Sequence, residues 1–541
     1  AWKSEMKATD PRGPFKNHQL HPMRGLTTLP ALSQPAAFLA ALLLTVPGCP
    51  FAHGQDARES PASPRVTAFP DFAAVGDGRA DATAALQRAI DSGMGAVRLP
   101  RGVYRITKPI RIDLDRVGFT SLHGDDVARI LMAGEGPALQ FVGTHEGSAD
   151  PATFKSNVWQ RQRMPLVDGL EIVGGHERAV GIELRGTMQV TVTRTLIREC
   201  LHGVHLVERN RNVIISDSHI YHQRGIGVFF DQVNLHQANI VGTHVSYCAG
   251  GGIVFRGGEV RNVHIGACDI ESNQGPDSPP TANILIDSGG SPYGTAEVAI
   301  TGCTIQHNSK SPGSANIRVL GRGAASPRSS RHEQWGHITI AGNVLSDVMT
   351  NIHLSGARGV TLTGNTFWPG YEYNLLVEDC QQIVLSANVL DRNPACEHRP
   401  GSPSRNAIVF RGSRDCTINA LHVHGVAADA GVFLEDCDRF NVTDCTILDC
   451  DDAGLLARNL TCSRISGCLI RDDREHPSEP LRIEGGSENQ ILDNHLGSPN
   501  RESSRQVHEW RGSGISRDDS RPGFVDWREA RARSETSHGW Y

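Results

Sequence analysis

The sequence has no surplus of positive charge and few aromatic residues. Its 541 residues include 53 Lys and Arg against 59 Asp and Glu, for a net charge of −6. This excludes a basic nucleic-acid surface as a property of the whole chain. Aromatic residues make up 6% of the chain, whereas 57 residues are Gly. We therefore expect many turns and a core of small and branched aliphatic side chains.

Zinc-binding cysteine pairs are also missing. None of the 13 Cys residues forms a C-x-x-C pair, so we expect no structural zinc site. We assign no metal-ligating residues. Cys268, Cys303, Cys445 and Cys468 occupy equivalent places in a repeat described below. We interpret them as small, soft core residues.

An apolar run near the N-terminus is too short to span a bilayer. Ala36–Val46 has eleven residues and follows Met23 and Arg24, which is typical of a signal peptide. We expect a signal or targeting segment at 1–54, a linker at 55–65, and an exported protein, extracellular or periplasmic, with no integral membrane segment after signal removal. Val46–Cys49 weakly resembles a lipobox, but Pro47 departs from it, so a lipid anchor at Cys49 is the less favoured alternative.

A short element recurs through most of the chain: a small or polar residue, any residue, then an aliphatic residue. Thr195–Ile197, Ser218–Ile220 and Thr243–Val245 are examples, and a strand of the Gly-Val-x-Leu type, such as Gly203–Leu206, follows each copy. A period of 20–25 residues with short strands and no helical pattern predicts the rung of a parallel β-solenoid. The pattern of leucine-rich repeats is absent. The column Asn343, Asn365 and Asn388 predicts an amide ladder between rungs.

An amphipathic helix is expected before the repeats. Asp81 is a suitable N-cap, and Ala85, Leu86, Ala89 and Ile90 share one face. Val97–Ile106 then predicts a strand, a turn and a second strand.

The segments FAAVGDGRADATAALQRAI and VRLPRGVYRI, followed by the repeats, resemble the pectate-lyase-like superfamily. Within it, they are similar to the branch that groups rhamnogalacturonase- and epimerase-like proteins with phage tailspikes. The resemblance covers about 66–498. It implies an all-β fold, a single right-handed parallel β-helix with a short N-terminal capping helix, and a groove along one sheet where polysaccharides lie. The remainder, 499–541, is expected to be a polar cap or tail.

The resemblance suggests one set of catalytic carboxylates. In the polygalacturonase branch, aspartates lie just before and on the strand that floors the groove. Asp429, Asp451 and Asp452 hold comparable positions here, and the 22-residue step would stack them on adjacent rungs. Paired carboxylates suit glycoside hydrolysis. However, the family's Gly-His-Gly and Arg-x-Lys motifs are missing.

A second candidate region lies in the middle of the repeats, 221–400, where long insertions would form the walls of a cleft. As catalytic residues we consider Glu271, Glu372 and His307, with Glu271 and Glu372 as an acid and a base. The expected substrate-binding residues are polar or aromatic: His222, Arg224, Lys310, Trp368, Tyr371 and Tyr373. Aromatic faces of this kind stack on sugar rings.

These observations lead to an exported polysaccharide-active enzyme that binds an extended, acidic glycan. Glycoside hydrolysis by carboxylates and β-elimination by a basic residue both remain open. Ca2+ is an option only for a lyase, which would neutralise the uronate with Arg, Lys or Ca2+ held on carboxylates, but no Asp cluster forms a clear Ca2+ site. The alternative is a non-catalytic carbohydrate-binding or surface-structural β-helix. No nucleic-acid partner is expected, and the oligomeric state remains open.

Overall fold

The computed structural model describes residues 76–147, 149–275, 278, 280–307, 311–322, 334–392 and 404–497. The expected signal segment, linker and C-terminal tail, together with Cys49 and Lys310, lie outside these residues. No helix in the described part of the chain is long and apolar enough to cross a membrane.

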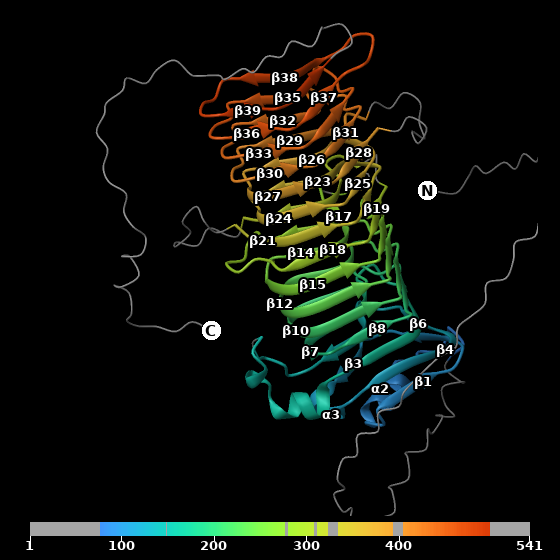
Figure 1. The fold of residues 1–541 in the computed structure, drawn as a ribbon. Coiled ribbons are helices and arrows are strands. Elements are labelled where there is room, and N and C mark those ends of the chain that lie inside the picture. Colours follow the sequence, from blue (N-terminus) through green and yellow to red (C-terminus); the bar gives the residue numbers. More distant parts are fainter. Residues whose placement is uncertain are drawn as a thin grey trace, which may run out of the picture. The chain divides into compact units, whose positions relative to one another are not determined.

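The described chain winds as a parallel β-helix with three strands in each turn (Figure 1). From β14 to β37, every strand pairs with the strand three places further along the chain. This confirms the solenoid predicted from the repeat.

The winding produces three parallel sheets, and four long strands, β4, β6, β10 and β12, pass from one sheet into the next. Sheet 1 contains β3 (Ile110–Asp113), β5 (Gly136–Val142), β7 (Ala179–Met188), the first parts of β10 (Val204–Ser216) and β12 (Ile226–Val241), β14 (Gly251–Arg256), β17 (Ala282–Asp287), β20 (Ala315–Leu320), β23 (Val348–Ser355), β26 (Gly370–Glu378), β29 (Ala407–Arg411), β32 (Val432–Glu435), β35 (Ala453–Arg458) and β38 (Glu479–Glu484). Sheet 2 contains β1 (Ala96–Leu99), the first parts of β4 (Ser121–Met132) and β6 (Leu166–Gly174), β8 (Thr191–Thr193), the second parts of β10 and β12, β15 (Glu259–Gly266), β18 (Val298–Thr301), β21 (Gly336–Ala341), β24 (Arg358–Thr363), β27 (Gln381–Ser386), β30 (Thr417–Asn419), β33 (Asn441–Thr443), β36 (Arg464–Ser466) and β39 (Gln490–Leu492). Sheet 3 contains β2 (Val103–Ile106), the second parts of β4 and β6, β9 (Leu196–Arg198), β11 (His219–Tyr221), β13 (His244–Ser246), β16 (Asp269–Glu271), β19 (Thr304–Gln306), β22 (Val344–Leu345), β25 (Thr366–Phe367), β28 (Val389–Asp391), β31 (His422–His424), β34 (Thr446–Leu448), β37 (Leu469–Arg471) and β40 (His495–Gly497).

One hydrophobic core runs along the inside of the three sheets. Alternate residues of each strand point inward, and the parallel register places them above one another. Ile220, Val245 and Ile270 form such a column in sheet 3, and all are fully buried. Phe230 and Phe255 stack in sheet 1 with ring centroids 4.2 Å apart. The four repeat cysteines are also buried, in agreement with their interpretation as core residues.

Helix α2 (Thr83–Asp91) covers the edge of the first rungs and buries Leu86, Ala89 and Ile90. It begins two residues later than Asp81, but the Asp81 carboxylate still accepts the backbone N–H of Thr83 at 3.0 Å. Hydrogen bonds from Thr107 and Thr83 lower the pKa of Asp81 to about 2. The Gln87 amide exchanges two 2.9 Å hydrogen bonds with the backbone of Arg111 in β3. The helix therefore caps an otherwise open strand edge. Three shorter helices are α3 (Leu114–Val117), a 3-10 helix (Pro151–Thr153) and a π-helix (Val158–Gln162).

Two asparagine ladders connect the rungs. The predicted ladder between sheets 2 and 3 is present: Asn343 donates to Asn365 at 3.0 Å, and Asn365 donates to Asn388 at 2.9 Å. The sequence reasoning missed a second ladder, where sheet 3 leads into sheet 1. There the side-chain amides connect Asn273, Asn283, Asn316, Asn351 and Asn374 in order, at 2.7–2.9 Å.

We expect Asn365→Ala to destabilise the fold by about 1–3 kcal/mol, because a buried amide and the groups bonded to it would lose their partners. Asn365 also accepts the Asn343 backbone N–H and donates to the Ile340 carbonyl. A lower urea midpoint would show the loss. Thr361→Ala, on an outward position of β24, should change stability by no more than about 0.5 kcal/mol.

Candidate active site

The strands of sheet 3 end in a recurring sharp turn toward sheet 1. The residue after β11, β13 and β19 has a left-handed backbone: His222 (φ 53°), Tyr247 (φ 60°) and His307 (φ 58°). Asp347 adopts the same conformation one rung after His307. Because the register stacks these turns, side chains from distant parts of the sequence meet at one corner of the solenoid.

The corner brings together an imidazole, two carboxylates and a phenol. His307 Nδ1 lies 3.3 Å from Glu271 Oε2, and its Nε2 lies 4.0 Å from Asp347 Oδ2. The Tyr247 hydroxyl donates to Glu271 Oε1 at 2.9 Å, which together with the Glu271 charge raises the pKa of Tyr247. The His307 side chain is 49% exposed, against 20% for Glu271 and 14% for Asp347. The imidazole is therefore more accessible than either carboxylate, and the carboxylates orient it; the Tyr247 side chain is exposed to a similar extent, at 47%.

His222 extends this group as an aromatic surface. Its ring stacks on Tyr247 at 5.0 Å between centroids and 14° between planes. The structure thus unites three predicted site residues, His222, Glu271 and His307.

A second layer of polar groups lies on the outer face of sheet 3. The Tyr221 hydroxyl lies 3.1 Å from His219 Nδ1 and 3.2 Å from His244 Nδ1. On the next rung, burial and the charge of Glu271 raise the pKa of Asp269. Its buried Oδ1 has no hydrogen-bond partner in the described chain.

Asp269 should make the fold less stable as pH rises. Its pKa in the folded chain lies above the ordinary value of the unfolded chain. Between these two pKa values the folded chain binds more protons than the unfolded chain, so the free energy of unfolding falls as the pH rises. We expect Asp269→Asn to raise the melting temperature at about pH 7 and to have little effect near pH 3, where both states are protonated. Asp217→Asn, at an exposed turn, serves as the control. An equal effect of Asp269→Asn at both pH values would contradict this account.

On the outer face of sheet 1, an arginine begins a row of polar side chains. Arg318 donates to His353 Nδ1 at 3.1 Å and to the carbonyls of Thr281 and Gly313 at 3.0 and 2.7 Å. Burial lowers the pKa of Arg318. None of the described carboxylates forms an ion pair with it, so its partners in the described part of the chain are all neutral.

Further along this row of polar side chains, the basic groups lie close to carboxylates. His353 Nε2 lies 3.1 Å from Glu378, and Arg411 lies 3.7 Å from Glu378 and 3.1 Å from Glu435. Burial and the nearby Arg318 lower the pKa of His353. Tyr373, a predicted binding residue, lies near Arg411 and helps to raise the pKa of this arginine, after Glu435.

Other predicted residues are placed differently. Glu372 is exposed in a bulge of β26, three rungs after Glu271 by register. That step corresponds to about 14 Å, too far for an acid–base pair at about 6.5–9.5 Å. The pairing of Glu271 with Glu372 is therefore not realised. Arg224 bonds the carbonyls of His176 and Glu199, so it ties turns together.

The predicted aspartate cluster is neutralised. Asp451 pairs with Arg474 at 2.6 Å and Asp452 with Arg482 at 3.2 Å, while Asp429 lies 3.8 Å from Arg405. The aspartates thus face arginines instead of forming a set of unpaired carboxylates.

The two remaining aromatics lie near the start of β26. Trp368 follows β25 and donates its backbone N–H to Leu345, and the Tyr371 carbonyl accepts the N–H of Arg405. Both side chains are partly exposed.

Three family models match consecutive parts of the chain. Residues 67–155 match "Rhamnogalacturonase A/epimerase, pectate lyase-like", 158–305 match "Right handed beta helix region", and 296–517 match "Periplasmic copper-binding protein (NosD)". A comparison with curated proteins finds no match.

The chain is similar to several solved structures at low sequence identity. Pre-mature gene product 12 of bacteriophage phi29 has a TM-score of 0.51 at 14% identity, covering 79% of this chain and 56% of that one, so this chain spans little more than half of that structure. A tailspike mutant of E. coli bacteriophage HK620, solved with a hexasaccharide, gives 0.48 at 12% identity, covering 76% and 77%. The mannuronan C-5 epimerase AlgE4 A-module of Azotobacter vinelandii gives 0.32 at 14%, covering 80% and 98%.

The copper binding named in one family description has no matching ligand set in the described chain. No group of three or more His, Cys, Asp or Glu residues there is arranged to hold a metal ion. At the corner, Glu271 and Asp347 face opposite nitrogens of His307, so the three do not surround one point. The consecutive family matches and the three-stranded parallel winding show that the chain is a pectate-lyase-like right-handed β-helix protein.

Proposed function

We propose that this protein is an exported enzyme that cleaves an extended, acidic glycan, with His307 as the acid–base group. The observation that carries the proposal is the exposed imidazole held between Glu271 and Asp347, with Tyr247 on the far oxygen of Glu271. Titratable groups that converge in this way are typical of catalytic sites. The match to a family described as rhamnogalacturonase A/epimerase supports a glycan as the substrate.

Glu271 would act on the reaction through His307. Its carboxylate faces Nδ1, so it favours the tautomer with the proton on Nδ1. Nε2 lies 4.0 Å from Asp347 Oδ2, beyond hydrogen-bond distance, and is therefore able to exchange a proton with substrate. Ser346 donates to Asp347 at 3.0 Å and fixes the second carboxylate. General acid–base catalysis of this kind contributes about 10²–10⁴-fold to a rate.

An acidic glycan agrees with the partners of Arg318. A partly buried cation is costly unless an anion compensates it, and its described partners are all neutral. The two carbonyls that accept from Arg318 lie in two connections from sheet 3 to sheet 1. Thr281 belongs to the connection that follows Glu271, and Gly313 belongs to the connection that begins at His307. The cation and the acid–base group thus lie at opposite ends of the same connections, and an extended substrate would contact both.

A non-catalytic glycan-binding protein is the second candidate. The stacked rings of His222 and Tyr247 favour it, because such a surface would hold a sugar ring without any reaction. In that case, activity would be absent and binding would depend on the aromatic faces.

The enzyme and the non-catalytic binding protein are distinguished by incubating the full chain with uronic-acid and neutral polysaccharides, with and without EDTA. We expect new reducing ends on an acidic substrate. Ultraviolet absorbance of an unsaturated product would identify β-elimination, and its absence would identify hydrolysis. Binding without new reducing ends on any substrate would replace the enzyme with the binding protein.

A further inference from the structure

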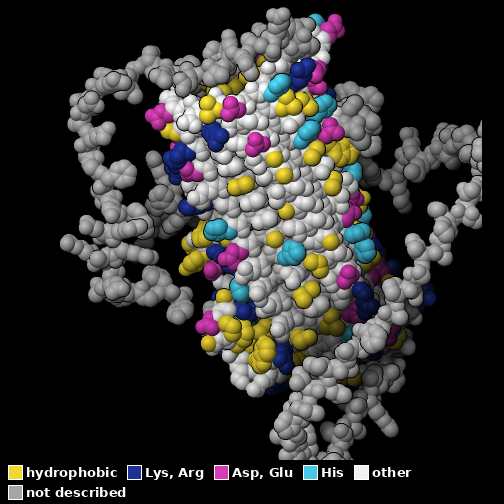
Figure 2. Space-filling view, viewed as in Figure 1, with side chains coloured by type: hydrophobic (Ala, Val, Ile, Leu, Met, Phe, Trp, Pro, Cys, Tyr) yellow, Lys and Arg dark blue, Asp and Glu magenta, His cyan; other side chains and the backbone are white. Residues whose placement is uncertain are grey.

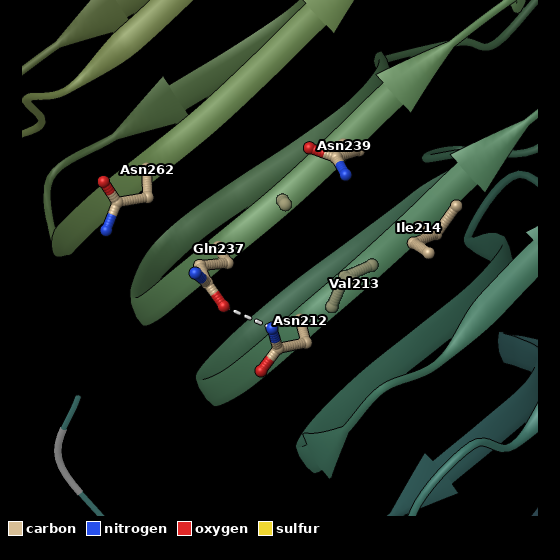
Figure 3. Close-up of a pocket in the computed structure, with 7 residues that line it drawn as sticks. Asn212, Val213, Ile214, Gln237, Asn239 and Asn262 are labelled. Carbon is tan, nitrogen blue, oxygen red and sulfur yellow. Dashed lines mark hydrogen bonds between the residues drawn. The ribbon is translucent and has the colours of Figure 1, made fainter. Parts of the chain in front are cut away.

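A separate hollow lies on the outer face of sheet 2, away from the corner of sheets 3 and 1. It has a volume of about 380 Å³ and is lined mainly by Asn212, Ile214, Gln237, Asn239 and Asn262 (Figure 3). These residues come from β10, β12 and β15, which pair side by side. None of them belongs to the proposed active site.

The rung geometry explains why amides gather there. Asn212, Gln237 and Asn262 each take a left-handed backbone, with φ of 53°, 71° and 58°, where the chain bends from sheet 1 into sheet 2. Asn tolerates this conformation better than most residues. Asn212 donates to Gln237, and Asn262 Nδ2 lies 2.7 Å from His236 Nε2.

Several hydrogen-bonding groups of the hollow remain available to a ligand. The Asn239 side chain makes no hydrogen bond within the described chain, and Asn212 Oδ1 and Gln237 Nε2 are likewise unused there. Ile214 adds an apolar surface that is 38% exposed. The hollow thus offers donors, acceptors and one aliphatic face.

The surrounding face carries almost no charge. One outward column runs in register from Ile214 to Asn441, and the neighbouring column runs from Ser216 to Thr443. Neither contains Asp, Glu, Lys or Arg, although 21% of the chain is charged. Figure 2 shows the middle of this face as white and yellow, with charged side chains mostly toward its borders. These two columns therefore provide nothing to neutralise a charged ligand; charged residues near the hollow include Glu297, one rung beyond Asn262, and Arg211, next to Asn212 in the chain.

We propose that this hollow is a binding site for a neutral saccharide. Each sugar hydroxyl both donates and accepts, which matches the two sides of an amide, and the C–H face of a ring matches Ile214. The volume lies at the lower end of ligand sites, about 300–1,000 Å³, and suits one or two sugar rings. The site is independent of the proposed cleavage reaction.

The test is titration calorimetry of the full chain with cellotriose, maltotriose, mannotriose and chitotriose, and with trigalacturonate for comparison. We expect at least one neutral trisaccharide to bind and Asn239→Asp or Gln237→Ala to weaken it at least tenfold. Asn441→Asp is the matched control, because it places the same substitution in the same outward column seven rungs away. That distance is about 34 Å, beyond the reach of a trisaccharide in the hollow, so the control should bind normally.

Three results would overturn the proposal: no binding of any neutral trisaccharide, unchanged binding by Asn239→Asp and Gln237→Ala, or equal weakening by Asn441→Asp. Sedimentation adds a fourth. A concentration-dependent dimer that Asn239→Asp dissociates would show that the hollow receives a second copy of the chain. Glu271→Gln should leave trisaccharide binding unchanged, so a failure here is distinguishable from a failure of the proposed catalytic site.

Discussion

Replacing Glu271 with Gln should lower the turnover of an acidic glycan by about 10²–10⁴-fold while changing KM little. The amide preserves the size of the side chain but removes the negative charge beside His307 Nδ1. His307→Asn should cause a loss of similar size, because it removes the group that exchanges the proton. The double variant should be no slower than the slower single variant, since the two residues act as one unit.

His424 provides a matched control within the same chain. It also lies between two carboxylates, at 3.4 Å from Asp391 and 3.4 Å from Asp449, but no described tyrosine contacts this group. We expect His424→Asn to retain full activity. A loss with His424→Asn and none with His307→Asn would move the active site to the later rungs. Equal circular dichroism spectra would establish that all variants fold.

The fold was predictable because its rule is local and repeats. A rung needs inward aliphatic residues and a small or amide residue at the turn, and both leave a periodic pattern. The ladder Asn343, Asn365 and Asn388 followed from that pattern alone. The second ladder was missed because insertions of different length separate its members, and the spacing in the sequence is therefore irregular.

The site was only partly predictable, since sequence distance does not measure distance along a solenoid. Glu271 and His307 are 36 residues apart in the sequence yet in contact in the structure. A long insertion adds residues between two neighbouring rungs without moving the rungs apart. Asp451 and Asp452 were predicted as catalytic carboxylates, but arginines one rung later neutralise their charges. Conversely, Asp269 and His353 occupy the variable middle position of the two repeated elements. The structure shows that this position points outward. An ionisable residue at this position therefore indicates a polar group on the outer surface, which the spacing of the repeats alone did not reveal.

Arg318 should determine the preference for an acidic substrate. We expect Arg318→Gln to weaken binding of an acidic oligosaccharide by about 10–100-fold, the effect of losing a charge-assisted hydrogen bond worth about 1.5–3 kcal/mol. Arg318→Lys should retain part of the affinity, because it keeps the charge but loses the fork of donors that reaches Thr281 and Gly313. Calorimetry at two salt concentrations measures both the affinity and its electrostatic part.

The control for this series is Arg358→Gln, which changes an arginine on sheet 2 that bonds the neutral side chain of Gln382 at 3.0 Å. It should bind the acidic glycan as the unmodified chain does. If Arg318→Gln also binds normally with unchanged salt dependence, the partly buried cation serves only to hold the connections that begin at Glu271 and His307. The corner alone would then recognise the glycan, and the negative charge of the glycan would need no partner on sheet 1. A weaker affinity that is independent of salt would mean that the substitution distorts the site, since the loss of a cation–anion contact must reduce the dependence on salt.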